Sequence, residues 1–373
     1  MSWDLDRRLE AIPSKIVLPL ARAEDALARL DERLAKSPIR EGWIARSHFT
    51  DAAAALWIEG ELVHLEDLVL HDAGRDARHP THELTRAHAI LRTRRRIAGA
   101  KPNWALSAAG LDALRGRAVR EQSGEYFGRG EGASNEDGSE DLPGGLPDSI
   151  ADTDPLADAF AAVDAAIASA NQVLAGEAGS RSEKRSRDPL AYDEDWDEEA
   201  RLAEWRSIVE RTSKLPPTLA AAVALEAWAS ISPLQHAPWL GPLLAAALLR
   251  EQGKARHHLP GLQAGLKTIP YARRRPGNLA DQLEAIAVAA EIGLKDHERW
   301  VTAKNLLGGR LVGRRASSKL PALVDYVMSR PLVSAGMIAD ELGITPRAAQ
   351  VLVADLGLRE MTGRGRYRAW GIL

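Results

Sequence analysis

The sequence predicts a mainly α-helical protein that ends in three short helices and a β-hairpin. Alanine and leucine are abundant and strand-forming residues are scarce, which favours helix over sheet. Apolar residues recur every three or four positions through most of the chain, which is the spacing of amphipathic helices. In residues 313–373 capping residues and then a glycine-rich turn interrupt this spacing. With 373 residues, 45% of them hydrophobic and 27% charged, the chain has room for two or three domains and a sizeable core.

Residues 1–120 are expected to form an N-terminal helical region. The stretch from Ile16 to Ala35 places leucines on one face and charged residues on the other, which predicts an amphipathic helix. Further helical stretches are predicted over 44–58, 62–70 and 81–97. Thr81 is a suitable N-cap for the last of them. This helix ends in a basic run, residues 92–96, which we expect to be a solvated helix end that complements the helix dipole.

Six of the ten histidines lie between His48 and His88, which raises the question of a metal site. The four that come closest to one another are His71, His79, His82 and His88. No pair of them stands in an HExxH motif, and no carboxylate follows at a matching ligand spacing. We therefore predict surface and helix-end roles for them, with no metal and no cofactor. The absence of cysteine excludes disulfides and thiolate metal sites.

Residues 121–155 are dominated by glycine, serine, aspartate and glutamate, which predicts an acidic flexible linker. Such a linker could shield a basic surface by mimicking a phosphate chain, but a solvated tether is the simpler interpretation. An alanine-rich helix is predicted over 156–174, and a polar patch separates it from the segment 193–209. No apolar run is long enough to span a bilayer, and the charged N-terminus has no signal-peptide core behind it. A cytoplasmic location is therefore expected.

Three helices are predicted at the start of the C-terminal segment. The first has apolar residues at helical spacing, namely Leu320, Leu323, Val324 and Val327. Ser334 is a suitable N-cap for the second helix, and Gly343 supplies the left-handed residue that ends it. Thr345 caps the third helix and Pro346 opens it. Its core-facing residues are expected to be Ala349, Leu352, Val353 and Leu356.

The third helix is the candidate recognition helix of a winged helix-turn-helix, because a strand, a glycine-rich turn and a second strand follow it. Its outer side would carry Arg347 and Gln350, whose donors suit guanine and adenine edges in a major groove. The hairpin would be the wing, in which three arginines would approach phosphates, namely Arg364, Arg366 and Arg368. From residue 310 onward ten Lys and Arg stand against five Asp and Glu, in a chain whose net charge is −3. Double-stranded DNA is the predicted partner, although a winged helix can also serve in dimerisation or docking.

From Leu215 the sequence runs LPPTLAAAVALEAWASISPLQHAPWLGPLLAAALLREQG. This stretch resembles the core of Fic-domain proteins, in which an alanine-rich helix enters a histidine loop, HPFx(D/E)GNGRxxR, and a leucine-rich helix follows. The resemblance implies a bundle of helices around that loop. Fic enzymes transfer AMP or a related group to a hydroxyl side chain. The loop histidine is the base, the acidic residue holds magnesium and the Gly-Asn-Gly-Arg run holds the phosphates.

The chain departs from the Fic motif at nearly every functional position. Ser232 stands where the histidine is expected, and Pro233 keeps the motif's proline. The acidic residue and the Gly-Asn-Gly-Arg run are replaced by His236, Ala237, Pro238, Trp239 and Leu240. Serine at its ordinary pKa cannot act as the base, and the replacing side chains cannot cradle phosphates. We therefore expect residues 156–312 to be a Fic-like core without Fic catalysis.

Two further stretches extend this resemblance. The stretch AALWIEGE is similar to the autoinhibitory motif (S/T)xxxE(G/N) of Fic proteins, with Glu59 and Gly60 in place and Ala55 at the hydroxyl position. In the family this glutamate pairs with the last arginine of the loop. No arginine occurs here between residues 234 and 249, so Glu59 is expected to lack its partner. Residues 283–300 look like the terminal helices that precede the DNA-binding domain of many bacterial Fic proteins.

Three other stretches are PTHELTRAH from Pro80, HAPWLG from His236 and EMTGRGRYRAWGIL from Glu360. They are similar to a family of bacterial proteins described as a domain of unknown function followed by a helix-turn-helix DNA-binding domain. This resemblance covers nearly the whole chain and implies no known substrate.

Three hypotheses for the function follow. The first is a DNA-binding transcriptional regulator whose core forms a dimer or senses a partner. The second is a nucleotide-using transferase of the AMP-transferring kind, in which His236 has taken over as the base. The third is an antitoxin-like protein that binds an active Fic enzyme and uses its winged helix for docking.

Overall fold

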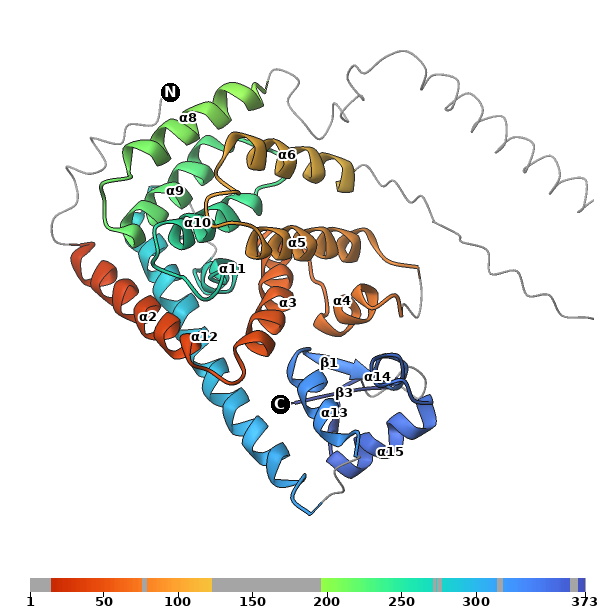
Figure 1. Cartoon of the computed structure of the whole chain (residues 1–373). Helices are drawn as coiled ribbons and strands as arrows, with labels where there is room; N and C mark the ends of the chain where they lie inside the picture. Colours follow the sequence, from red (N-terminus) through yellow and green to blue (C-terminus); the bar gives the residue numbers. More distant parts are fainter. Residues whose placement is uncertain are drawn as a thin grey trace, which may run out of the picture. The chain divides into compact units, whose positions relative to one another are not determined.

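The computed structural model describes residues 15–75, 79–122, 196–270, 273, 277–313, 318–362 and 368–372. Its N-terminal helices are α2 (Val17–Ala35), α3 (Arg40–Ile58), α4 (Leu65–Asp72), α5 (His82–Gly99) and α6 (Ala108–Gln122). The central helices are α8 (Glu198–Arg211), α9 (Pro217–Ile231), α10 (Leu240–Glu251), α11 (Leu262–Leu266) and α12 (Leu279–Gly309). The C-terminal elements are α13 (Leu320–Met328), β1 (Leu332–Ser334), α14 (Ala335–Leu342), α15 (Pro346–Leu356), β2 (Arg359–Glu360) and β3 (Ala369–Gly371) (Figure 1). The predicted mainly helical fold class is confirmed.

Helix α9 is the most deeply buried helix of the central group. Its sequence is rich in alanine and carries a single charged residue, Glu226, so no face of the helix needs to meet water. Helices α8, α10 and α12 pack around it. Trp205 of α8 donates its indole N–H to the carbonyl of Ala224 over 3.0 Å, and its ring meets that of Trp228 edge-on at 5.2 Å. The alanine-rich stretch is therefore the axis of the core.

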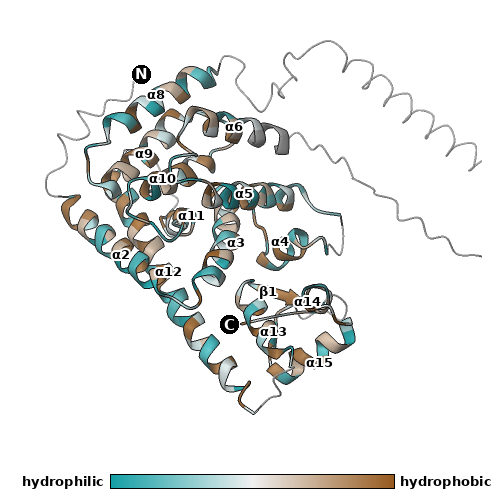
Figure 2. Cartoon of the chain, viewed as in Figure 1, coloured by the Kyte–Doolittle hydropathy of each residue, from teal (hydrophilic) through white to brown (hydrophobic). Residues whose placement is uncertain are grey.

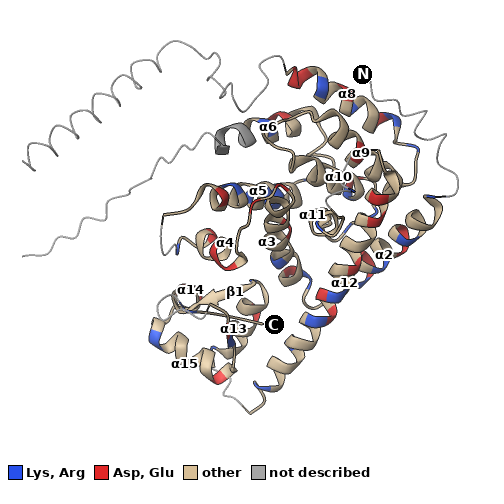
Figure 3. Ribbon diagram, turned by 180° about the vertical axis from the view of Figure 1, so that it is seen from behind, with Lys and Arg blue, Asp and Glu red and all other residues tan. Residues whose placement is uncertain are grey.

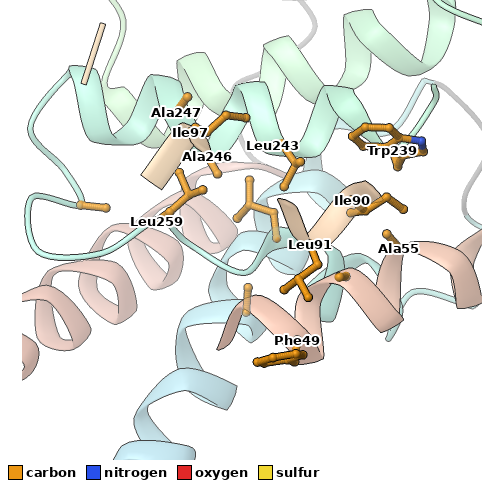
Figure 4. Packing of buried hydrophobic residues seen from close by; sticks show 14 of the residues in the cluster. Phe49, Ala55, Ile90, Leu91, Ile97, Trp239, Leu243, Ala246, Ala247 and Leu259 are labelled. Atoms are coloured by element: carbon orange, nitrogen blue, oxygen red, sulfur yellow. The ribbon is translucent and has the colours of Figure 1, made fainter. Parts of the chain in front are cut away.

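Helices α3, α5 and α10 meet in a second part of the same core. Figure 4 shows Ile90 and Leu91 of α5 and Ala55 of α3 in one apolar cluster with Leu243 of α10, with Phe49 of α3 on the side away from α10. On the other side of the bundle, α2 packs along α12. Helix α2 is amphipathic as predicted, with Leu27, Leu30 and Leu34 buried and most of its hydrophilic residues on the outer face (Figure 2). Among the described residues, no helix is both long and apolar enough to cross a membrane.

The prediction that residues 92–96 form a solvated helix end is wrong for Arg94. Its side chain is fully buried and donates to the Asp51 carboxylate over 2.8 Å. It also donates to the carbonyl oxygens of Leu259 over 2.7 Å and Pro260 over 3.1 Å. Burial lowers the pKa of Arg94 and raises that of Asp51, because each charged form loses its hydration. The predicted solvation failed for Arg94 because one side of the last turns of α5 packs against α3 and the loop before α11, while Arg92 and Arg96 on the other side are exposed.

The C-terminal segment contains a three-stranded antiparallel sheet that the sequence pattern did not fully predict. The strand order is β1-β3-β2, with Val333 opposite Trp370 and Glu360 also opposite Trp370. The two strands of the predicted hairpin are β2 and β3. Strand β1, between α13 and α14, was not predicted, because three residues are too few for an alternating pattern.

Several other expectations differ in extent from the structure. Helix α3 begins at Arg40 rather than at residue 44, and α12 continues to Gly309, beyond the predicted 283–300. Helices α6 and α11 were not predicted. The linker 121–155 lies outside the described residues, apart from its first two positions, which belong to α6. The predicted helix over 156–174 also lies outside them.

Candidate nucleic-acid interface

Three local capping interactions place α15 beside α14. Ser334 accepts a hydrogen bond from the backbone N–H of Met337 and caps α14, which ends at Gly343 in the left-handed conformation. Thr345 then accepts from the backbone N–H of Ala348 over 3.2 Å, and Pro346 occupies the first turn of α15. Each cap satisfies helix-end groups within four residues in the sequence. The predicted boundaries of both helices are confirmed.

The caps also determine which side of α15 faces outward. Ala349, Val353 and Leu356 are buried, as predicted, and Leu352 is half-buried. The opposite side is exposed and carries Arg347, Gln350, Val351 and Ala354. The two charged residues of the helix are Arg347 in its first turn and Asp355 in its last (Figure 3). The predicted reading residues Arg347 and Gln350 are therefore displayed on one accessible face.

The wing arginines are described only in part. Arg364 and Arg366 lie outside the described residues, so their approach to phosphates remains a prediction. Arg368 donates from Nε and Nη2 to Oε2 of Glu360 over 2.8 and 2.5 Å, and its guanidinium lies 5.6 Å from the centre of the Trp370 ring. The Glu360 carboxylate raises the pKa of Arg368. Glu360 thus orients Arg368 and competes with a phosphate for it.

Two arginines of the basic C-terminal segment have partners within the protein. Arg310 donates to the carbonyl oxygens of Leu356 and Gly357 at the C-terminal end of α15. Nη1 of Arg330 lies 3.7 Å from Oδ2 of Asp72. The guanidinium carbon of Arg330 lies over the Tyr326 ring, 5.4 Å from the ring centre. The local excess of basic residues therefore overstates the charge that is available to DNA.

The helix-turn-helix domain is held against the N-terminal helices through α13 and α14. Arg46 of α3 is buried and donates to the carbonyl oxygens of Val327 over 2.9 Å and Met328 over 3.0 Å. Burial lowers the pKa of Arg46 to about 10, and the Trp300 ring lies 5.0 Å from its guanidinium. Arg75, after α4, pairs with Asp340 of α14. These contacts fall on α13 and α14, while the outer face of α15 stays exposed.

The loop that resembles the Fic motif is packed into the core. Ser232 is the left-handed C-cap residue of α9, at φ 48°, and donates its backbone N–H to the Trp228 carbonyl over 2.8 Å. Pro233 and Trp239 are buried, and Figure 4 shows Trp239 among the apolar side chains. His236 is 7% exposed, with Nδ1 3.2 Å from Oε1 of Glu198. The Fic-like interpretation of this loop remains a prediction.

The expectation that Glu59 lacks a partner is wrong. Arg86 of α5 donates to the carboxylates of both Glu59 and Glu61. Burial raises the pKa of Glu59, and the Arg86 charge opposes this shift. Gly60 follows in the left-handed conformation, at φ 88°, where α3 ends. The partner comes from α5 rather than from the loop, so a comparison with the Fic motif alone could not identify it.

Two of the clustered histidines, His71 and His88, contact each other, and His88 also contacts a carboxylate. Nε2 of His88 lies 3.3 Å from Oδ1 of Asp72. The centres of the His88 and His71 rings are 4.7 Å apart. Burial, with help from Arg94, lowers the pKa of His48 well below its ordinary value. Across the part of the chain that the structure describes, no group of three or more His, Cys, Asp or Glu could hold a metal ion.

Two residues of the candidate interface and its attachment, Val351 and Arg46, were not predicted from the sequence. Val351 exposes 58% of its surface on the outer face of α15. Along the helix it follows Arg347 and Gln350 and precedes Ala354, which are exposed on the same face. The helical spacing could have revealed it, because it lies four residues after Arg347. Arg46 could not have been found in this way, since its partners lie more than 280 residues further along the chain.

Comparisons with known proteins agree with this domain order. Residues 190–312 match the family described as "Protein of unknown function (DUF1612)", and residues 320–373 match the family described as "HTH DNA binding domain". The second match begins at the first residue of α13. The chain is also 50% identical over 397 aligned residues to "Uncharacterized protein y4cF" of Sinorhizobium fredii (strain NBRC 101917 / NGR234), with 100% of both chains covered.

Proposed function

The chain belongs to the family of that rhizobial protein. Because it carries a DUF1612 match followed by a helix-turn-helix DNA-binding domain, we propose that it is a sequence-specific regulator of transcription. The observation that carries this proposal is the outer face of α15, where Arg347 and Gln350 are exposed within the segment that matches the DNA-binding family. Arg347 can donate two hydrogen bonds to a guanine edge, and Gln350 can donate one and accept one at an adenine edge in a major groove.

The hairpin of β2 and β3 is proposed to act as a wing. The strand order β1-β3-β2 beside a helix-turn-helix supports this interpretation, because β2 and β3 are neighbouring antiparallel strands of the sheet. Arg364, Arg366 and Arg368 would contact phosphates there, which positions the protein without reading sequence. We also propose a dimer, since paired helix-turn-helix domains read two half-sites about 10 base pairs apart.

The core is proposed to have a regulatory rather than a catalytic role. In the transferase alternative, His236 would have to reach a substrate hydroxyl. Its 7% exposure and its contact with Glu198 support a structural role instead. Trp239 is buried where the Fic motif has phosphate-binding glycines, which also gives the alternative no support.

The proposal is tested by selecting a binding site for the full-length protein from random duplexes. Affinity is then measured on the selected and a scrambled duplex across a salt series. Arg347→Ala and Gln350→Ala should remove the preference for the selected site, at a cost of roughly 1–3 kcal/mol there, and leave most of the nonspecific affinity. Arg366→Ala should weaken both duplexes alike and lower the salt slope by about 0.9.

Arg29→Ala is the matched control, because Arg29 is an exposed arginine on α2 whose side chain is 60% accessible. It should leave both affinities and the slope unchanged. Failure to recover any preferred duplex would refute sequence-specific binding. Equal losses on both duplexes for the α15 variants would show that another element reads the bases. A selected site with two inverted copies would agree with the proposed dimer, and a single copy would oppose it.

A further inference from the structure

Val351 is an exposed aliphatic side chain in the middle of a polar helix face. It exposes 58% of its surface, whereas the other large aliphatic side chains among the described residues from 318 onward are buried or half-buried. Valine is also a weaker helix former than Arg, Lys, Glu or Ala, so helix formation does not favour it at an exposed position. Neither packing within the domain nor helix propensity explains this residue.

The position of Val351 on α15 is fixed by the helix start at Pro346 and the Thr345 cap. It lies four residues after Arg347, and residues at this spacing are neighbours on one helix face. Gln350 comes directly before Val351, and Ala354 lies about one turn after it. Both residues are exposed. A ligand that contacts Arg347 and Gln350 therefore also covers the methyl groups of Val351.

The major groove of DNA presents one apolar group, the C5 methyl of thymine. We propose that Val351 is a specificity-determining residue that contacts a thymine methyl in the bound duplex. This inference rests on the proposed function and adds a base identity to it. The hydrophobic contact would recover the apolar area that Val351 exposes to water in the free protein.

The geometry also limits where this thymine lies. Four residues of α-helix span about 6 Å, and successive base pairs of one strand are about 3.4 Å apart. The thymine should therefore lie within about two base pairs of the guanine that Arg347 contacts. Gln350, between them, would contact an adenine in the same short stretch.

The test removes the methyl group from the DNA without changing any other base-edge group. Each thymine of the selected duplex is replaced in turn by deoxyuridine, and the affinity of the full-length protein is measured. Replacement of one thymine should weaken binding about fourfold, the factor that corresponds to about 0.8 kcal/mol for one buried carbon group. Replacement of thymines farther than about two base pairs from a guanine that Arg347 contacts should have no effect.

Protein variants assign the effect to Val351. Val351→Ala should bind the thymine and deoxyuridine duplexes equally, while Val351→Thr, which keeps one methyl group, should retain part of the difference. Val17→Ala is the matched control, because Val17 is a valine of similar exposure, 61%, at the start of α2. It should keep the full fourfold difference. Circular dichroism of each variant verifies that the fold is intact.

The inference is overturned if the selected site contains no thymine near the guanine or if no deoxyuridine replacement changes the affinity. It is also overturned if Val351→Ala keeps the difference, because another residue would then read the methyl group. Each of these outcomes leaves sequence-specific binding itself in place. A protein that shows no preference for any duplex would instead refute the proposed function, and this inference with it.

Discussion

At the scale of single residues, the buried pair of Arg94 and Asp51 joins three separate parts of the core. Arg94 on α5 reaches Asp51 on α3 and the carbonyls of Leu259 and Pro260 before α11. Asp51 in turn accepts from the backbone N–H of Ala264 over 3.2 Å. All of the partners lose their water together, so each one depends on the others for its hydrogen bonds.

We predict that Arg94→Met destabilises the protein by about 3–5 kcal/mol, because it leaves the Asp51 charge and two carbonyls buried without their donor. Urea unfolding measures the change in free energy. The matched control is Arg92→Met on the exposed side of the same helix, which should change stability by less than about 0.5 kcal/mol. Equal effects of the two substitutions would contradict the buried position of Arg94.

At the scale of elements, the approach of α3 to α13 depends on a glycine. A Cβ added at Gly42 would lie 2.7 Å from the carbonyl oxygen of Met328. Arg46, one turn later on α3, donates to that same carbonyl. The N-terminal helices and the helix-turn-helix domain therefore meet backbone to backbone at this point.

The close approach of α3 to α13 predicts opposite effects for two glycine-to-alanine substitutions. Gly42→Ala should destabilise the protein by about 1–3 kcal/mol, since the new methyl group meets backbone that cannot rotate away. Gly116→Ala in α6, where nothing lies within 4 Å of the added Cβ, should stabilise by about 0.5–1 kcal/mol. Thermal unfolding of both variants measures the difference. A stabilising Gly42→Ala would show that α3 and α13 do not pack as described.

At the scale of the whole molecule, we expect a DNA-binding domain attached to a core that performs no group transfer. In the core, Ser232 caps α9 and Trp239 fills apolar space. Both positions would need to face a nucleotide in a working Fic loop. In the C-terminal domain, Arg347 and Gln350 are exposed together on the outer face of α15.

We therefore predict that the full-length protein transfers no AMP from radiolabelled ATP and magnesium to itself or to other proteins. An active Fic enzyme provides the positive control for labelling. Label that is lost in His236→Ala but kept in Gln350→Ala would favour the transferase alternative, because only the first substitution alters the core. If the full-length protein transfers no label to itself or to other proteins, the result supports the regulatory proposal.

The sequence alone determined the elements that local interactions build. Ser334, Gly343 and Thr345 act on groups within four residues, and their types fix the ends of α14 and α15. The outward position of Arg347 and Gln350 then follows from helical spacing. For this reason the helix-turn-helix and its proposed reading face could be predicted.

Only the tertiary structure decided which partners the charged residues of the core and of the helix-turn-helix domain have. The partners of Arg94, Arg46 and Glu59 come from other elements, up to 282 residues away. A solvated arginine and a buried one have the same spacing in the sequence, because burial depends on which distant backbone packs over the helix. The partners of Arg310 and Arg330 and strand β1 were missed for the same physical reason, since the interacting groups are not neighbours in the chain.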